Sequence, residues 1–136
     1  MSKFAAILVL ILGIGMLFGG TVGAVFTYNE ATSHVVTVHE DGPFFGGRTL
    51  NGPFDMWSQS NAIEGHTLSY TDGKYFAEMD RDDPTRDLWV TATTLRTALG
   101  LGTLAYGVSA LAFANGLALA AIGGSRLRRG SSLRQF

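Results

Sequence analysis

Residues 4–26 read FAAILVLILGIGMLFGGTVGAVF and contain no charged side chain. As a helix rising ~1.5 Å per residue, this stretch would be about 34 Å long, enough to cross a hydrocarbon core of roughly 30 Å with some tilt. The alternative is a cleaved signal peptide with its cleavage site near Thr21–Ala24. However, the apolar run exceeds the ~7–15 residues usual in signal peptides, and only Lys3 gives a basic start. We therefore predict a transmembrane helix over residues 4–26, preceded by a cytoplasmic N-terminus at residues 1–3.

The charges of the chain are confined to particular zones. All 11 acidic residues lie between Glu30 and Asp87, and residues 97–125 carry no charge. This second uncharged stretch, although rich in glycine and alanine, is also long enough to span a membrane. Asp83-Pro84 resembles a helix N-cap followed by proline in the first turn. We predict a second helix over residues 89–124, with its transmembrane part at about 97–124. Trp89 either anchors this helix at the membrane surface or packs on the preceding segment.

The basic residues predict the orientation. Lysine and arginine are enriched on the cytoplasmic side of membrane proteins, and they occur here just before the first helix and just after the second. We expect a multi-pass plasma-membrane protein with residues 27–88 outside the cytoplasm and residues 125–136 as a basic cytoplasmic tail. The tail could bind anionic lipid such as cardiolipin. The residues expected at lipid headgroups or interfaces are Arg96, Arg126, Arg128 and Arg129.

The segment between the two helices has the composition of a small folded piece. Residues 34–40 are rich in β-branched side chains and predict a strand, and residues 54–64 predict a short helix. Residues 71–74 predict a tight turn between Leu68–Tyr70 and Tyr75–Ala77. The chain has no cysteine, so a piece this small needs a partner, a membrane surface or a metal for stability. The fold class predicted is an all-α membrane protein: two transmembrane helices joined by an acidic extracytoplasmic segment with a few short strands and turns.

No residue pattern predicts catalysis. His39 and His66 could be combined with Glu40 or Glu64 as a two-histidine, one-carboxylate metal site, but their spacing fits no established ligand pattern. Residues 78–83 lack the glycine and closing glutamate of a calcium loop. A phosphate-binding loop and a serine nucleophile elbow are also absent. With no charge deep in either span, an ion or proton path is not expected either. We expect no catalytic, cofactor-binding or metal-binding residue, and no nucleic-acid partner.

Both predicted helices carry small residues at four-residue spacing, a pattern that lets another helix approach closely. The alternative is the general abundance of glycine in membrane helices. The two strips could face each other in a hairpin, or each could face a foreign subunit. Asn115 within the second helix would need a hydrogen-bond partner. The predicted packing residues are Gly15, Gly19, Gly23, Ala112, Gly116, Ala120 and Asn115, with Gly124 continuing the second strip.

Four stretches resemble one known family. They are GRTLNGPF at 47–54, QSNAIEGH at 59–66, GKYFAEMDRDDPTR at 73–86 and TLRTAL at 94–99. Together they are similar to an actinobacterial group of small two-helix membrane proteins, many of which are labelled aromatic ring-opening dioxygenase. The resemblance extends from about Val35 to Gly116 and is most specific at 75–86. A ring-opening dioxygenase needs a deep pocket and a bound iron, and the sequence predicts neither.

The resemblance implies a structural role in respiration. Proteins of this group accompany the actinobacterial respiratory supercomplex that joins cytochrome bcc to the aa3-type cytochrome c oxidase. The chain would then be a non-catalytic accessory subunit for assembly or stability, with haem and copper held by its cytochrome c oxidase and cytochrome bcc partners. The alternatives are a stand-alone two-helix envelope protein that self-associates through Gly15, Gly19 and Gly23, or a metal-dependent enzyme using His34, His39 and His66.

Overall fold

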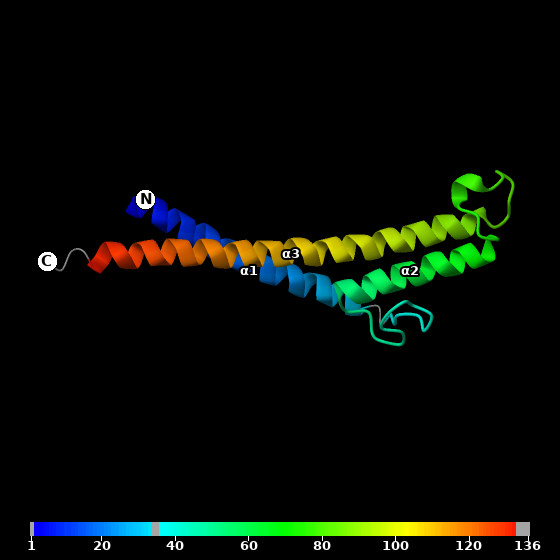
Figure 1. Ribbon diagram of the computed structural model, residues 1–136, viewed down its shortest axis with the longest axis horizontal. Coiled ribbons are helices and arrows are strands. Elements are labelled where there is room, and N and C mark those ends of the chain that lie inside the picture. Colours follow the sequence, from blue (N-terminus) through cyan, green and yellow to red (C-terminus); the bar gives the residue numbers. More distant parts are fainter. Residues whose placement is uncertain (1, 34–35, 133–136) are drawn as a thin grey trace. The chain divides into compact units, whose positions relative to one another are not determined.

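The computed structural model describes residues 2–33 and 36–132, and the side chains up to residue 128 (Figure 1). Its elements are α1 (Lys3–Ser33), α2 (Pro53–Tyr70), a 3-10 turn η1 (Phe76–Glu78) and α3 (Arg86–Ser132). The prediction of two long apolar helices, one near each end, is confirmed: α1 and Arg86–Arg128 of α3 are long and apolar enough to cross a membrane. Each helix extends beyond the predicted span, and the third helix, α2, is longer than the short helix predicted at 54–64.

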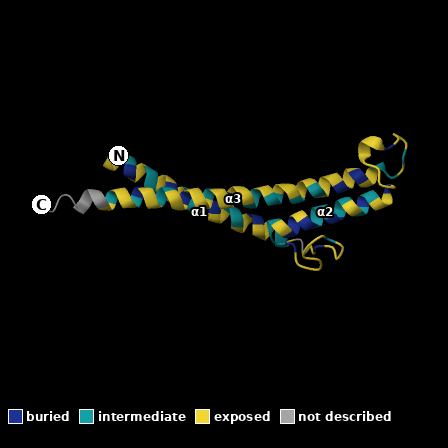
Figure 2. Ribbon diagram, viewed as in Figure 1, coloured by how far each residue is buried: buried dark blue, intermediate teal, exposed yellow. Residues whose placement is uncertain are grey.

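The chain divides into two compact units. The first, which we call the apolar unit, comprises the described residues of Met1–Phe26 and Tyr106–Phe136; the second, the polar unit, is Thr27–Ala105. α1 and α3 contribute to both units. In the apolar unit the two helices meet along small residues, and many of their large apolar residues are exposed (Figure 2). Phe4 and Phe18, for example, are 72% and 71% exposed.

The polar unit is built around the start of α3 and the adjacent α2. Trp89 and Ala92 of α3 are buried with Met79, and Ile63 and Leu68 of α2 pack against them. The Trp89 indole N–H donates to the carbonyl oxygen of Lys74 at 2.9 Å. Of the two roles open for Trp89, the structure therefore has it packing on the preceding segment.

The strand predicted at 34–40 is not formed in the part of it that is described, residues 36–40. The backbone instead makes one isolated antiparallel bridge between Thr37 and Thr49. It is flanked by a bond from the Val38 N–H to the Arg48 carbonyl (2.8 Å) and one from the Leu50 N–H to the Val36 carbonyl (2.8 Å). An isolated two-stranded ribbon is marginally stable, and turns at residues 40–47 end this one after a few residues. His34, where the strand was predicted to begin, lies outside the described residues.

The tight turn predicted at residues 71–74 is present, but it joins α2 to η1 and not two strands. α2 continues through Tyr70, and the turn ends the helix. Asp72 and Gly73 have φ of 51° and 76°, and the Gly73 N–H donates back to the Leu68 carbonyl at 2.8 Å. A left-handed glycine that returns an N–H to the last helical turn is a common C-cap. The residues that follow form η1 instead of a second strand.

Candidate functional site

The contact between α1 and α3 in the apolar unit is a seam of small residues. A Cβ atom at Gly13 would lie 2.5 Å from the Ala120 nitrogen, and one at Gly20 would lie 2.7 Å from the Phe113 nitrogen. On α3, a Cβ atom at Gly116 would lie 2.6 Å from the Leu17 nitrogen. The neighbouring atoms are backbone atoms, so the two helices approach as closely as their main chains allow. Glycine is therefore required at these positions.

Some of the predicted packing residues lie in this seam, and others lie outside it. Gly116 and Ala120 lie in it, and Gly23 faces the Ser109 side chain, with 2.6 Å between the Gly23 Cβ position and Ser109 Oγ. Gly15 and Gly19 are exposed, and a Cβ atom at either position, or at Gly124, would meet nothing within 4 Å. Ala112 is half-buried. Asn115 is exposed, and its side-chain amide donates to the Leu111 carbonyl of its own helix at 2.9 Å.

The buried small residues of the seam follow a seven-residue spacing on both helices, and not the predicted four-residue spacing. Small buried residues recur at seven-residue spacing as Ala6, Gly13 and Gly20 on α1, and as Ser109, Gly116 and Gly123 on α3. Two helices that stay in contact over several turns meet every seven residues. The sequence contains both spacings, and the structure shows that the seven-residue series follows the seam.

The predicted interfacial arginines have different surroundings. Arg96 was expected to reach lipid headgroups, but in the polar unit its guanidinium forms a 2.7 Å ion pair with Glu64 of α2. Its Nε also donates to Ser60 Oγ at 3.3 Å. Glu64 lies opposite because α2 continues past it alongside α3. At the other end of α3, Arg126 and Arg128 are exposed, whereas the side chain of Arg129 lies outside the described part of the chain.

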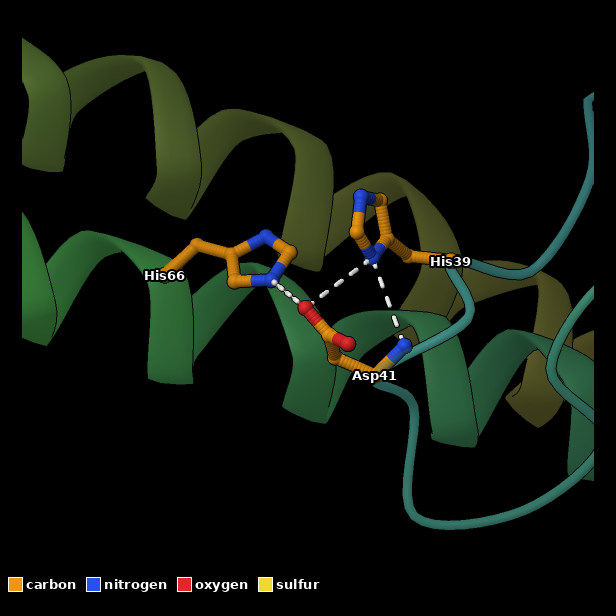
Figure 3. Close-up of side chains that lie close together, drawn as sticks. All are labelled: His39, Asp41 and His66. Atoms are coloured by element: carbon orange, nitrogen blue, oxygen red, sulfur yellow. Dashed lines mark hydrogen bonds and ion pairs between the residues drawn. The ribbon is translucent and has the colours of Figure 1, made fainter.

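His39 and His66, 27 positions apart in sequence, come together in the polar unit with Asp41 (Figure 3). His66 Nε2 lies 3.3 Å from Asp41 Oδ2, and His39 Nδ1 lies 3.6 Å from the same oxygen. The two imidazole rings are edge to face, with centroids 4.4 Å apart. The carboxylate that joins the histidines is Asp41, and neither Glu40 nor Glu64, the two candidates from the sequence, belongs to this group.

Two polar side chains of α2 hold the loop that carries His39 and Asp41. Gln59 Oε1 accepts the His39 backbone N–H at 2.7 Å. The fully buried Ser58 hydroxyl accepts the Phe44 N–H at 3.2 Å and donates to the Phe44 carbonyl. Because Gln59 and His66 are seven residues apart on one helix, they share a face. The bond from Gln59 thus places His39 over the face that presents His66.

An apolar cavity of about 600 Å³ lies elsewhere in the polar unit. Its walls come from the end of α1, the loop after it, α2 and α3, with Thr27, Glu30 and Gln59 as the polar exceptions. None of the three cluster residues lines it. The cavity and the histidine cluster therefore have different lining residues, and Gln59, which lines the cavity, also accepts the His39 backbone N–H.

Asp83, the residue predicted as the N-cap of the second helix, lies shortly before α3, which begins at Arg86. Thr85 donates to Asp83 Oδ1 from its hydroxyl (2.6 Å) and from its backbone N–H (2.8 Å). Both bonds favour the carboxylate, the hydroxyl bond most, so they lower the pKa of Asp83 below its ordinary value of 3.8. α3 begins at Arg86, after this turn, so Asp83-Pro84 precede the helix instead of starting it.

This hydrogen bonding predicts a measurable pH dependence. We expect the Asp83 carboxyl to titrate below pH 3.8 in a ¹³C NMR titration. Since its folded-state pKa is lowered, the folded chain binds this proton more weakly than the unfolded chain. Its stabilising contribution is therefore present above the unfolded pKa and is lost as the pH falls through the folded pKa. Thr85→Val should raise the pKa by removing the hydroxyl donor, and Thr85→Ser should preserve it. An unchanged pKa in Thr85→Val would contradict the assignment.

Comparisons with known proteins add no relative: no family model, no curated protein and no solved structure matches this chain.

Proposed function

We propose that this chain is a membrane-anchored, non-catalytic accessory subunit of the actinobacterial cytochrome bcc–aa3 supercomplex. The observation that carries the proposal is the outward-facing apolar surface of α1 and α3. Each of these helices contains an apolar stretch of 18 residues, of which only 17% in α1 and 11% in α3 is buried within the chain. The core helix of a soluble protein would bury most of this surface, so these two helices need an apolar environment of lipid or protein.

The surface of α1 away from the seam supports a protein partner. Gly15 and Gly19 leave a backbone strip open on α1, and Gly15 borders a shallow apolar groove with Leu8 and Leu12. Since lipid tails offer no preference for glycine, such strips are typical of contacts between membrane helices. In the proposed role this strip packs on a helix of the oxidase or of cytochrome bcc. We propose this partner because four sequence stretches of the chain resemble the accessory-subunit group.

The topology proposed for this role places both termini in the cytoplasm and the polar unit on the outer face of the plasma membrane. The exposed Arg126 and Arg128 near the end of α3 support a cytoplasmic tail, because basic residues concentrate on that side. There they can bind anionic lipid such as cardiolipin. The chain would hold no haem or copper, and these cofactors would remain in the partner subunits.

A pull-down in mild detergent tests the role. The tagged chain should co-purify a-, b- and c-type haem in a reduced-minus-oxidised spectrum, from membranes that contain the oxidase. In the variant Gly15→Leu/Gly19→Leu, the amount of co-purified haem should fall at least tenfold, because two leucines would fill the open strip. The matched control is Gly107→Leu on α3, a position that is equally open, and it should retain the haem. Equal loss in both variants would contradict the assignment to the α1 strip.

A second candidate is a stand-alone envelope protein that self-associates through the same α1 strip. Gly23 faces Ser109 within the chain, so only Gly15 and Gly19 of the three predicted glycines remain open for this contact. A colourless eluate, together with cross-linking of the chain to itself that Gly15→Leu/Gly19→Leu abolishes, would favour this candidate over the supercomplex role.

A further inference from the structure

We propose that His39, Asp41 and His66 form a binding site for a divalent transition-metal ion, with Zn²⁺ as the best fit. Among the described residues, this is the group of histidine, cysteine and acidic side chains whose ligand atoms converge, all lying within 4.8 Å of one another. The inference does not rest on the respiratory role, because it uses only contacts within the polar unit.

The donor atoms suit a borderline ion. Two imidazole nitrogens and one carboxylate oxygen match the ligand preference of Zn²⁺, whereas Mg²⁺ and Ca²⁺ prefer oxygen ligands alone. Neutral imidazole and ionised carboxylate are the forms that bind a metal. Three protein ligands would leave a fourth position for water or for a group from a partner.

The spacing of the donor atoms also fits. With metal–ligand bonds of ~2.0–2.2 Å, neighbouring ligand atoms in a tetrahedral site are roughly 3.3–3.5 Å apart. The two distances to Asp41 Oδ2, 3.3 Å from His66 Nε2 and 3.6 Å from His39 Nδ1, are close to this value. The two histidine nitrogens need to approach each other, and His39 Nδ1 needs to release the hydrogen bond that it accepts from the Asp41 backbone N–H at 3.4 Å. Side-chain rotation can provide this, because the His39 and His66 side chains are 54% and 39% exposed.

The scaffold presents these ligands from two separate segments. His66 is fixed on α2, whereas His39 and Asp41 lie on a loop that is bound to α2 through Gln59 and Ser58. Gly42, next to Asp41, fits closely here: a Cβ atom on it would lie 2.9 Å from Ser58 Oγ. An ion would therefore join the loop to the helix in a chain that has no cysteine for a disulfide. Supporting contacts of this kind orient metal ligands.

Titration of the full chain in detergent with Zn²⁺ and with Co²⁺ tests the site. We expect one equivalent of Zn²⁺ by calorimetry and an intense visible Co²⁺ spectrum, which is typical of low coordination numbers. His39→Ala, His66→Ala and Asp41→Asn should each weaken binding at least tenfold, since even loss of a supporting contact costs 10–100-fold. Glu40→Gln is the matched control, because it removes the adjacent carboxylate, which is not in the cluster, and it should bind as the parent does.

A second measurement keeps the proposal testable if a variant fails to fold. In the unaltered chain, Zn²⁺ should shift the ¹⁵N signals of the His39 and His66 rings together, at Nδ1 and Nε2 respectively, and Mg²⁺ should not. The proposal is overturned if Co²⁺ keeps the weak spectrum of the aqueous ion. It is likewise overturned if Zn²⁺ leaves both rings unshifted, which would make the cluster an ion-pair network only. Neither outcome bears on the haem pull-down, so the two proposals fail separately.

Discussion

Gly116→Leu is expected to separate α1 from α3 in the apolar unit. A Cβ atom at this position would already lie 2.6 Å from the Leu17 nitrogen and 2.8 Å from the Gly13 carbonyl oxygen. Both atoms belong to the backbone of α1, so no side-chain rotation can relieve the overlap. Adding carbon atoms to a filled contact typically costs about 1–3 kcal/mol. A leucine also adds three carbons beyond Cβ, so we expect a cost at or above the upper end of that range.

The absence of cysteine from the chain provides a direct measurement of this separation. A Cβ atom at Gly23 would lie 3.7 Å from Ser109 Cβ, which is close to the ~3.8 Å mean of disulfides. The variant Gly23→Cys/Ser109→Cys should therefore cross-link readily under mild oxidation. Adding Gly116→Leu should slow the cross-linking at least tenfold, whereas adding Gly15→Leu should not change it. Equal rates in the two backgrounds would refute the seam.

The difference between Gly15 and Gly116 shows where sequence reasoning reached its limit. Runs without charge predict the existence of both long helices, because an uncharged run of this length has few other stable structures. The spacing of glycines does not decide which face makes the contact. α1 carries a four-residue series at Gly15, Gly19 and Gly23 and a seven-residue series that includes Gly13 and Gly20. Only the position of α3 distinguishes the two series, and it leaves Gly15 and Gly19 open.

The histidine cluster shows a different limit: the sequence allowed His39 and His66 to be combined, but with Glu40 or Glu64 instead of Asp41 as the carboxylate. Nothing in the local sequence places His39 beside His66, because the contact depends on the loop returning to α2. The bonds that bring it back, from Gln59 to the His39 N–H and from Ser58 to Phe44, join residues 14 to 20 positions apart. Polar contacts of this range have no periodicity to detect.

The turn at residues 71–74 illustrates a third limit. A left-handed glycine after an aspartate serves equally well in a hairpin and at a helix C-terminus. Here the length of the preceding helix decides between them. α2 runs unbroken to Tyr70, and its Ile63 and Leu68 pack on the core around Trp89. Residues 68–70 are therefore helical, and the turn caps the helix.

Trp89→Ala is expected to destabilise the polar unit by about 3–5 kcal/mol, the usual cost of removing a large buried aromatic side chain. Trp89 is 4% exposed, and its ring lies 5.3 Å from that of Tyr75. Its indole N–H also satisfies the Lys74 carbonyl. A loss of this size is a large fraction of the stability of a small unit, so amide hydrogen exchange of α2 should accelerate by several orders of magnitude.

The second tryptophan supplies a control of the same size and chemistry. Trp57 is 49% exposed and stacks on Phe44, at 5.9 Å between ring centroids, so Trp57→Ala should cost about 1 kcal/mol. In Trp57→Phe, the remaining Trp89 fluorescence should be shifted to the blue and protected from acrylamide. An anchor at the membrane surface would not pack on Ile63 and Leu68 of α2. If Trp89 had that role instead, Trp89→Ala would leave the hydrogen exchange of α2 unchanged.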